Sequence, residues 1–402
     1  MRIRMGPDVL VVGAGPAGAA VSILLARQGH CVRLLDRATF PRDKACAEYL
    51  SPACTPILEH LGVLPAVLAA QPRHLQGMRV TDYRGRSCWG RFLQDGRAMT
   101  GLALPRRVLD NVLVQQAQRE GVDVQTGFWV RQPLCERQRV CGIVGQRGRH
   151  RETLRARLVI AADGVYSTLA RRLGLVRRVR WLQHTAFVTH YTGIAAVQPW
   201  GEMFLVPAGY IGLASVGEAL VNVSVVLRAA YLKDRQSPTE HVVTETIQAH
   251  PELQQRFAQA RRVTALLATG PMAQRTMRPQ HDGILFIGDA AGFLDPFTGQ
   301  GIYLALQSAM LAATAAHQAL DEPHGATASL QHYVRAHRQV WQDKYRLSAL
   351  IQLGLRMPWL ANHVIVRLAR RPALADTVVG VTGDLLSPKS VLSWRFAAQV
   401  LR

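Results

Sequence analysis

The feature that most constrains this chain is a glycine-rich turn close to its N-terminus. The apolar run 9–12 leads into Gly13, Gly15 and Gly18, which are spaced as Gly-x-Gly-x-x-Gly. When a strand ends in such a turn and a helix follows at once, the free backbone N–H groups at the helix start attract an anion. The pattern therefore predicts a parallel α/β unit that binds the diphosphate of a dinucleotide.

Each small residue of this turn has a separate physical reason to be there. Gly13 permits the tight turn, Gly15 lets the backbone approach the pyrophosphate, and Gly18 lets the helix lie close to its strand. Pro16 and Ala17 open the expected helix over 17–28, and proline suits a first turn because the N–H it lacks would have no helical partner. An isolated glycine turn is weak evidence, but here the flanking elements fall where a dinucleotide site needs them.

An acidic residue ends the next apolar run, which we expect to be a strand over 31–36. Asp36 lies 36 − 18 = 18 residues after Gly18. A carboxylate at about this spacing accepts hydrogen bonds from both hydroxyls of a ribose and repels a 2′-phosphate.

Two later segments repeat the pattern of an apolar run that ends in a glycine and an acid. The run 156–160 leads to Asp163 and Gly164, and the run 283–287 leads to Gly288 and Asp289. Such a sequence marks a place where backbone passes close to a cofactor, although Asp-Gly is also a common plain turn.

After the last of these acids comes a segment rich in small residues. It contains Pro296, Gly299 and Gly301, and an apolar, alanine-rich helix is expected from 299 or 300 to about 319. Asp289 is placed to accept from a ribityl hydroxyl. The start of that helix would favour negative charge on the edge of a reduced flavin ring.

These three motifs, in this order, make the chain resemble the para-hydroxybenzoate hydroxylase-like FAD flavoproteins over most of residues 8–320. Within that superfamily, the run GDAAGFLDPFTGQGIYLAL and the loop PRDKACAE at 41–48 most resemble the geranylgeranyl reductase family. The resemblance implies an α/β fold in which a Rossmann-like FAD-binding domain is interleaved with an antiparallel-sheet substrate domain and followed by a C-terminal helical region. The expected ranges are 1–75, 100–180 and 276–320 for the FAD-binding domain, 76–99 and 181–275 for the substrate domain, and 321–402 for the helical region.

The resemblance also implies which residues hold FAD. Arg106 is expected to reach the FAD phosphates or ribityl chain, although Arg107 could take that role and a solvated arginine is the alternative. The expected FAD-binding residues are Gly13, Gly15, Pro16, Ala17, Gly18, Asp36, Arg37, Lys44, Ala45, Cys46, Arg106, Asp163, Gly164, Gly288, Asp289, Pro296, Gly299, Gly301 and Ile302.

The chain departs from its relatives beside the expected flavin face. Reductases of this family carry Cys-Gly-Gly or Cys-Gly-Glu after the lysine, whereas this chain has Cys46-Ala47-Glu48. Cys46 could tune the flavin or donate a proton, or it could be an ordinary buried cysteine. No carboxylate or histidine near the motifs is an obvious general acid.

Alternating apolar and polar residues between 185 and 227 predict an antiparallel sheet over the substrate, with turns at 199–201 and 208–209. Polyprenyl reductases typically present Tyr-x-Trp-x-Phe-Pro in this sheet. The matching positions are Tyr210, Gly212, Ala214 and Ser215, so only the tyrosine is kept. We predict Cys46 and Tyr210 as residues of the reaction site. Without the tryptophan and the proline, a bulkier or differently shaped lipid could use the space that they leave.

Composition limits the partners. The 402 residues hold 48 Lys+Arg against 27 Asp+Glu, a net charge of +21. The basic residues are scattered arginines without interleaved aromatics, which argues against nucleic acid. Basic segments with tryptophan at 353–371 and 391–401 either lie on an anionic membrane surface or pack on the protein's own core.

The cysteines and the termini limit the compartment. The six cysteines form no CxxC pair and have no histidine partners at zinc spacing, so we predict no metal site and a reducing cytoplasm. We expect no signal peptide and no transmembrane helix. The protein is therefore expected to be cytoplasmic, with peripheral association at the inner face of the cytoplasmic membrane as one interpretation.

The sequence leaves three functions open. The first is a geranylgeranyl reductase-like enzyme, in which reduced FAD transfers a hydride to a carbon–carbon double bond of an apolar, isoprenoid or lipid-like small molecule. The second is a monooxygenase that hydroxylates a polyketide-like or aromatic substrate with NAD(P)H and O2, and Gly292 and Ile302 count against it because aromatic hydroxylases usually carry His and Asn there. The third is a flavoprotein that passes electrons to a quinone. No second Gly-x-Gly-x-x-Gly is present, so NAD(P)H would dock only transiently. The sequence does not predict the oligomeric state.

Overall fold

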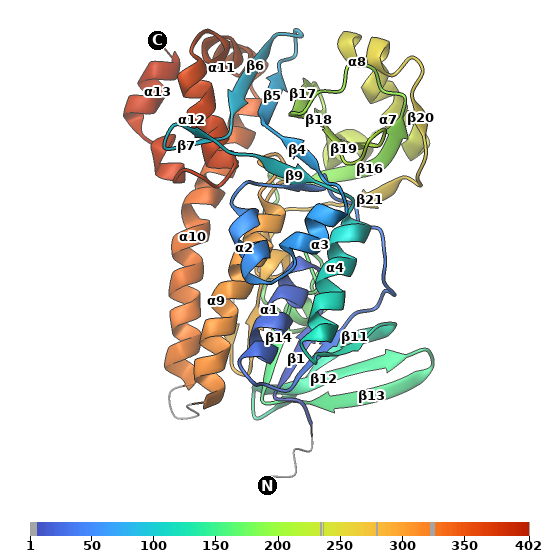
Figure 1. Cartoon of the computed structure of the whole chain (residues 1–402), viewed down its shortest axis with the longest axis vertical. Helices are drawn as coiled ribbons and strands as arrows, with labels where there is room; N and C mark the ends of the chain where they lie inside the picture. The colour runs from blue at the N-terminus through green and yellow to red at the C-terminus, as the bar shows by residue number, and fades with distance from the viewer. Residues whose placement is uncertain (1–5, 234, 236, 279, 322–325, 402) are drawn as a thin grey trace.

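A parallel sheet forms the centre of the lower half of the molecule (Figure 1). The computed structural model describes residues 6–233, 235, 237–278, 280–321 and 326–401. In this sheet only the edge strand β23 pairs in antiparallel fashion. The strand order is β10 (Asp123–Gln125), β2 (Val32–Leu35), β1 (Val9–Val12), β14 (Leu158–Ala161), β24 (Ile284–Phe286) and β23 (Gln280–His281). Because parallel strands end at the same edge, the turns after β1, β14 and β24 meet there.

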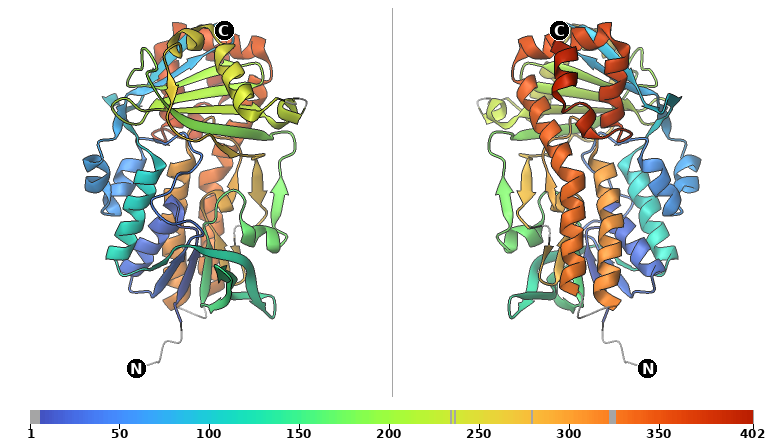
Figure 2. Two further views of the ribbon diagram at one scale, coloured as in Figure 1. Left: turned by 90° about the vertical axis from the view of Figure 1, so that its right-hand side faces the viewer. Right: turned by 90° about the vertical axis from the view of Figure 1, so that its left-hand side faces the viewer.

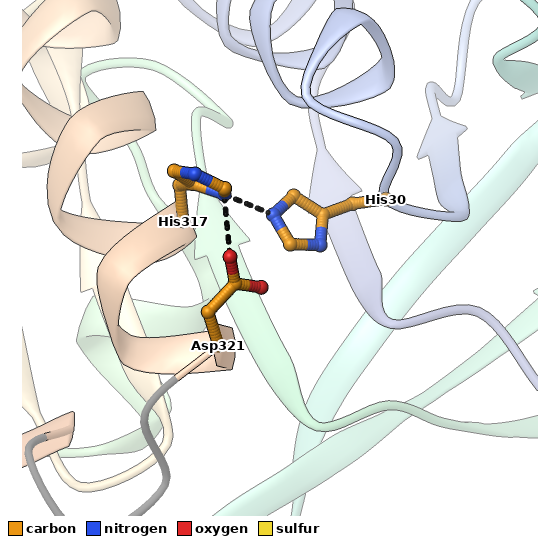
Figure 3. Close-up of side chains that lie close together, drawn as sticks. All are labelled: His30, His317 and Asp321. Atoms are coloured by element: carbon orange, nitrogen blue, oxygen red, sulfur yellow. Dashed lines mark hydrogen bonds and ion pairs between the residues drawn. The ribbon is translucent and has the colours of Figure 1, made fainter.

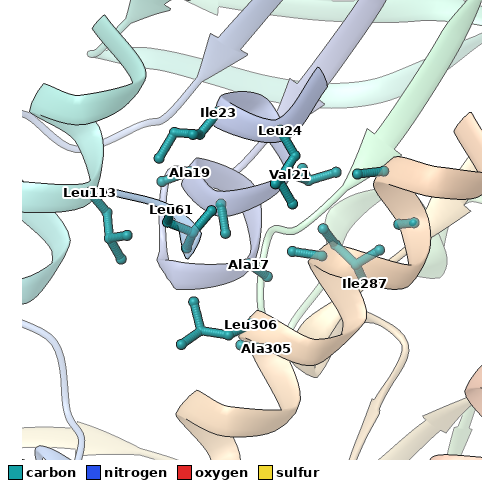
Figure 4. Close-up of a cluster of buried hydrophobic side chains, with 14 of the residues drawn as sticks. Ala17, Ala19, Val21, Ile23, Leu24, Leu61, Leu113, Ile287, Ala305 and Leu306 are labelled. Atoms are coloured by element: carbon teal, nitrogen blue, oxygen red, sulfur yellow. The ribbon is translucent and has the colours of Figure 1, made fainter. Parts of the chain in front are cut away.

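Two long helices begin at this edge and pack side by side, α1 (Pro16–Arg27) and α9 (Gly301–Asp321). Every residue of α1 from Pro16 to Leu25 is buried, because α9 and α4 (Arg106–Arg119) both pack against it. Figure 4 shows small and branched side chains filling this space, among them Ala17, Val21 and Leu306. Alanines allow the helix axes to approach closely, which fixes both helix starts at the glycine turns.

A second, largely antiparallel sheet lies above the first, and we call it the upper sheet (Figure 2). One of its faces packs on α7 and α8, and its other face points toward the nucleotide motifs and the C-terminal helices. Its strand order is β20 (Arg261–Arg262), β16 (His184–Thr192), β19 (Val221–Arg228), β18 (Gly209–Ser215), β17 (Gly201–Val206), β5 (Gly77–Thr81) and β6 (Ser87–Arg91), with β21 (Leu267–Thr269) paired to β16.

Shorter elements surround these two layers. The smaller sheets are β11 (Phe128–Glu136), β12 (Arg139–Arg147) and β13 (His150–Arg155); β15 (Val176–Arg178), β22 (Gln274–Thr276) and β25 (Gly292–Phe293); β3 (Tyr49–Leu50), β9 (Gly101–Ala103) and β4 (Arg73–Leu75); and β7 (Leu93–Gln94) with β8 (Arg97–Ala98). The remaining helices are α2 (Cys54–His60), α3 (Leu64–Ala69), α5 (Thr168–Arg172), α6 (Ala229–Lys233), α7 (Thr239–Gln248), α8 (Pro251–Arg256), α10 (Ala326–Leu355), α11 (Pro358–Arg370), α12 (Pro372–Thr382) and α13 (Trp394–Leu401), with 3-10 turns η1 (Gly288–Ala290) and η2 (Pro388–Ser390).

The expected fold class is confirmed, with a parallel nucleotide-binding sheet, an antiparallel sheet and a helical C-terminal region. The helices expected over 17–28 and from 299 or 300 to 319 correspond to α1 and α9. The domain division stays a prediction, and residues 1–5, 234, 236, 279, 322–325 and 402 of those ranges lie outside the described residues.

The C-terminal segment expected over 353–371 is broken in two. Helix α10 ends at Leu355 and α11 begins at Pro358, because proline lacks the N–H that a continuous helix needs and fits a first turn. Among the described residues no helix has both the length and the apolar character needed to cross a bilayer.

Candidate active site

The glycine turn after β1 has no room for side chains at two of its positions. A Cβ on Gly13, whose φ is +101°, would lie 2.4 Å from the carbonyl oxygen of Ala162. A Cβ on Gly18 would lie 1.8 Å from the carbonyl oxygen of Gly13. The reasons that the sequence suggested for these two glycines are thus visible as close backbone contacts.

Gly15 faces a different environment, two guanidinium groups. Its φ of −76° suits any residue, so glycine would be needed here only for the close approach of a ligand. The position of a Cβ on Gly15 lies 3.7 Å from Arg42 Nη2 and 3.8 Å from Arg106 Nη2. Pro16 and Ala17 follow as the buried first turn of α1. The helix start and the two arginines therefore bring positive charge to one point.

This positive charge exceeds the acidic charge beside it. Arg106 donates two hydrogen bonds to Asp110, of 2.8 and 2.9 Å, and Arg42 Nη1 lies 3.2 Å from the same carboxylate while making no hydrogen bond. Limited hydration lowers the pKa of Lys44, and the charges of Arg106 and Arg42 lower it further, while Asp289 acts in the opposite direction. Two carboxylates thus face three cations, and a bound diphosphate would supply the missing negative charge. The residues present fit the diphosphate of FAD.

The three predicted acids differ in how much hydrogen-bonding capacity they retain. Asp36 accepts from the backbone N–H groups of Ala14 and Ala38, at 2.7 and 2.8 Å. Asp163 accepts from the N–H of Thr168 at 2.7 Å through Oδ2, whereas its buried Oδ1 has no hydrogen-bond partner.

Burial raises the pKa of Asp163, against backbone and hydroxyl hydrogen bonds that lower it. Burial likewise raises the pKa of Asp289, opposed by Lys44 and Arg106. The unpaired oxygen of Asp163 fits a ligand hydroxyl, while Gly164, with φ +78°, leaves open space beside it. Arg37 is exposed and Ala45 half-buried near the same turn.

The loop after β24 connects the two halves of this site. Gly288, with φ +55°, has its Cβ position 3.0 Å from the Cβ of Ala17. A Cβ on Gly299, whose φ is +68°, would lie 2.8 Å from the ring of Tyr49. Gly301 begins α9, and a Cβ there would meet nothing within 4 Å. Pro296 is half-buried in the same loop, and Ile302 is buried with its side chain in the core of α1 and α9.

A buried acid follows Cys46 and was missed by the sequence reasoning. Glu48 has φ +59°, a left-handed backbone that residues with a Cβ rarely adopt, and its side chain is 3% exposed. It accepts from Asn222 Nδ2 at 2.9 Å and from the N–H of Arg106 at 2.8 Å, and it lies 2.6 Å from His190 Nε2. We call Glu48, His190 and Asn222 the Glu48 cluster.

Cys46 is held directly against this cluster. Its carbonyl accepts from Asn222 Nδ2 at 2.9 Å, and its sulfur accepts from the N–H of Glu48 at 3.3 Å. A carboxylate and a histidine therefore lie beside Cys46, although neither was an obvious general acid in the sequence. The histidine comes from β16, far from the motifs in the sequence, which is why local reasoning did not find it.

A second polar cluster surrounds Tyr210. Its hydroxyl donates to Asp295 Oδ1 at 2.7 Å, and the same carboxylate accepts from Gln352 at 2.6 Å and lies 2.7 Å from His184 Nδ1. Burial, and then the charge of Asp295, raises the pKa of Tyr210 well above its ordinary value. We call Asp295, His184, Tyr210 and Gln352 the Asp295 cluster. Tyr210 is thus a fixed, neutral donor to Asp295.

The register of the upper sheet places the two clusters at opposite ends of one face. Asn222 pairs with His190 and Ala214, and Val226, four residues further, pairs with Tyr210. Four residues of strand span about 13 Å. Cys46 and Tyr210 therefore belong to separate clusters. The same face between them carries Ala186, Val188, Gly212 and Ser224, and Met203 of β17 lies beside Gly212 on it. All of these except Gly212 are buried.

Comparisons with known proteins agree with this site. The model of the FAD binding domain family matches residues 7–348. Digeranylgeranylglycerophospholipid reductase 1 of Methanopyrus kandleri is 30% identical, over 84% of this chain and 87% of that protein. Menaquinone reductase of Mycobacterium tuberculosis is 30% identical, over 78% of this chain and 77% of that protein.

Solved structures share the fold. A geranylgeranyl bacteriochlorophyll reductase-like protein from Thermoplasma acidophilum has a TM-score of 0.82 at 21% identity, covering 98% of each chain. A flavin-dependent brominase also has a TM-score of 0.82, at 22% identity, covering 98% of this chain and 97% of its own. Reductases and halogenases share this architecture, so the fold alone does not separate their reactions.

The FAD-binding family match spans most of the chain, and the sequence relatives over most of its length include reductases. Together with the cationic turn and its three acids, these matches show that the protein is an FAD-dependent oxidoreductase. The chain belongs to the geranylgeranyl reductase family of FAD-binding oxidoreductases.

Proposed function

We propose that the protein reduces a carbon–carbon double bond of an apolar, isoprenoid-like lipid, with NAD(P)H as the transient source of electrons. The observation that carries this proposal is the face of small residues between the Glu48 and Asp295 clusters. It forms a strip of mostly small side chains about 13 Å long beside the cofactor motifs, along which an isoprenoid chain would lie. The sequence relatives of this protein include enzymes named for digeranylgeranylglycerophospholipid and menaquinone, both of which carry isoprenoid chains.

FAD would be held by residues that the sequence predicted, together with Arg42, which it did not predict. Arg42, Lys44 and Arg106 would face its diphosphate, and Asp36, Asp163 and Asp289 would accept from its hydroxyl groups. When bound, FAD supplies the hydride for the double bond. The start of α9 at Gly301 would stabilise negative charge on the flavin ring through its free N–H groups.

Reduction of a double bond also requires a proton, and the Glu48 cluster is placed to hold one. Glu48 and His190 share a contact of 2.6 Å, so one proton can lie between them. The His190 side chain is 12% exposed, which connects the buried acid to solvent. Asn222 hydrogen-bonds both Glu48 and the Cys46 backbone, so the thiol of Cys46 is kept beside the proton shared by Glu48 and His190.

The Asp295 cluster would position the far end of the substrate site. Asp295 joins the upper sheet through Tyr210 and His184, and it joins α10 through Gln352. Phe297 packs edge-on against Tyr210 at 5.0 Å between ring centres. This hydrogen-bonded arrangement holds the far end rigid, and the Phe297 ring gives it an apolar side that would orient a hydrocarbon chain.

The substrate would reach this site from a membrane. Five large apolar side chains are exposed on the C-terminal helices, which we call the tryptophan surface: Leu350, Leu353, Met357, Trp359 and Trp394. Arg346 and Lys389 line a surface hollow together with Leu350 and Leu353. Apolar side chains beside basic ones suit an anionic lipid surface. The six cysteines are all free, which suits a reducing compartment on the inner side of that membrane.

An anaerobic oxidation experiment tests the proposal. The holoenzyme is reduced in the absence of oxygen and mixed with vesicles that contain a geranylgeranyl-chain lipid, or with matched vesicles whose chains are saturated. We expect the flavin absorbance to return only with the unsaturated lipid. No return with either lipid, together with rapid NAD(P)H use when an aromatic or polyketide-like compound and air are supplied, would favour the monooxygenase alternative.

A further inference from the structure

Two histidines and an aspartate meet at the end of the molecule opposite the cofactor motifs (Figure 3). His30 follows α1, while His317 and Asp321 lie in the last turns of α9. Because α1 and α9 both begin at the glycine turns and pack side by side, their C-terminal ends also lie together. The proximity was invisible in the sequence, since His30 and His317 are 287 positions apart.

Around His317, two imidazole nitrogens and a carboxylate oxygen face one another, and they have fewer N–H protons to share than atoms that can accept one. His317 Nδ1 lies 2.9 Å from His30 Nε2 and 3.4 Å from an oxygen of Asp321. A neutral imidazole carries a single N–H, so at most one of the two facing ring nitrogens needs to donate, and the carboxylate is an acceptor only. A cation at the centre would satisfy all three groups at once.

The three groups match the ligand set of a transition-metal ion. Zinc binds imidazole nitrogen at about 2.0–2.1 Å and carboxylate oxygen at about 2.0–2.2 Å. Two ligand atoms of a tetrahedral zinc site are therefore about 3.3 Å apart. The ligand atoms of His30, His317 and Asp321 all lie within 4.8 Å of one another, so small side-chain rotations would complete the site. Asp321 is exposed, which leaves a position open for water.

We propose that His30, His317 and Asp321 form a binding site for one divalent transition-metal ion, with zinc as the ion of best fit. Imidazole suits zinc, copper and nickel, whereas a site with two nitrogen ligands disfavours magnesium and calcium. The partial negative charge at the C-terminal ends of α1 and α9 adds to the attraction for a cation. Arg157 is the nearby opposing charge, and it is already engaged by the carbonyl of Leu320 and by Asp8.

The role of this site is structural. Helix α9 has 21 residues, so its two ends are about 30 Å apart and the metal takes no part in the redox reaction. Instead, the ion joins the C-terminal ends of the two helices whose N-terminal ends hold the cofactor. Binding to the folded protein alone raises its thermal stability by mass action.

Equilibrium dialysis tests the proposal on the untagged, FAD-loaded protein. After removal of metals with a chelator, the protein is dialysed against micromolar zinc chloride, and bound zinc is measured by mass spectrometry relative to bound FAD. We expect about one equivalent in the wild type, together with a higher Tm. We expect none in His30→Gln or His317→Gln, and binding weakened by at least about tenfold in Asp321→Asn.

Matched controls separate this site from other ligands. His150→Gln removes an exposed histidine of β13, and Cys31→Ser removes the exposed thiol next to His30; both should retain the zinc. Unchanged FAD content shows that each variant is folded, and His317→Gln decides the matter if His30→Gln fails to fold. Equal zinc in the wild type and His317→Gln, or no zinc in the wild type, would overturn the proposal.

Discussion

At the scale of single residues, Glu48 carries most of what distinguishes this site from a plain cofactor-binding turn. Its left-handed backbone turns the side chain toward three hydrogen-bonding partners, the N–H of Arg106, His190 and Asn222. A strained, buried carboxylate persists only when its surroundings fix it, and such positions cluster at functional sites.

Replacing Glu48 with glutamine tests its role as the holder of the proton. The change keeps the shape of the side chain and removes the carboxylate. We expect kcat to fall by about 10²–10⁴-fold, with FAD content retained and KM little changed. Steady-state kinetics across pH measures both effects. Glu59→Gln, on the exposed face of α2, is the matched control, and an unchanged kcat in Glu48→Gln would remove Glu48 from the mechanism.

Gly212 tests where the substrate lies. A Cβ there would only touch Met203 and Ser224, at 3.9 Å, so the backbone tolerates a side chain. Gly212→Trp restores the aromatic residue that polyprenyl reductases typically carry and fills the strip between the clusters. We expect kcat/KM to fall by at least about tenfold for a bulky lipid, because overlap with a side chain excludes it. Gly212→Ala should remain nearly as active as the wild type; if Gly212→Trp does too, the substrate lies elsewhere.

At the scale of elements, the sequence predicted those helices, strands and turns that depend on residues close together in the chain. The glycine turn, α1 and the alternating strands of the upper sheet each follow from spacing within a few residues. The clusters do not, because His190 meets Glu48 across 142 positions and Gln352 meets Asp295 across 57. One signal was present: His184 and His190 are an even number of residues apart in one strand, so both face the same side.

Helix α12 and helices α7 and α8 were also not predicted. Helix α12 packs against β6, and α7 and α8 pack against the apolar face of the upper sheet opposite the substrate strip. Their positions depend on tertiary burial rather than on a strong local pattern. The ion pair between Lys344 of α10 and Asp384 of the C-terminal loop also depends on tertiary structure, because the two residues meet only in the fold.

Helix α10 makes the stability of the protein depend on pH. His337 stacks on Trp341 at 4.0 Å between ring centres, its Nε2 has no hydrogen-bond partner, and burial lowers its pKa to about 4. The unfolded chain binds a proton near pH 6.5 and the folded chain does not, so stability is fully present above pH 6.5 and is lost as pH falls toward 4.

We therefore expect the free energy of unfolding to drop by about 2 kcal/mol between pH 8 and pH 5 because of this histidine. His337→Phe keeps the stacked ring and removes the titrating group, so this part of the drop should disappear. Urea unfolding of the two proteins at both pH values measures the difference. Equal pH dependence in both would show that His337 is not its source.

At the scale of the whole molecule, the C-terminal region packs on the upper sheet at the Asp295 cluster and is hydrogen-bonded to the loop before α9. Asp384 accepts from Ser51 at 2.7 Å and from Gln300 at 2.5 Å, and it pairs with Lys344. Gln300 immediately precedes α9. The helices that carry the tryptophan surface are therefore fixed relative to the flavin site.

Loss of the tryptophan surface should weaken contact with lipid and leave the chemistry intact. Trp359 and Trp394 are 69% and 77% exposed, so their replacement by serine costs the folded protein little. We expect Trp359→Ser with Trp394→Ser to reduce sedimentation with anionic vesicles severalfold, while FAD content stays constant. Trp129→Ser is the control, because Trp129 lies on β11 and is itself 45% exposed. Equal vesicle binding by all of these proteins would place the membrane contact elsewhere.

The mass of the product distinguishes reduction of a double bond from hydroxylation. The holoenzyme is incubated with NADPH and a geranylgeranyl-chain lipid, once without oxygen and once in air, and the lipid is extracted for high-resolution mass spectrometry. If the enzyme reduces double bonds, we expect under both conditions a product that is heavier by two hydrogen atoms for each double bond reduced. A product that forms only in air and is heavier by one oxygen atom would contradict it.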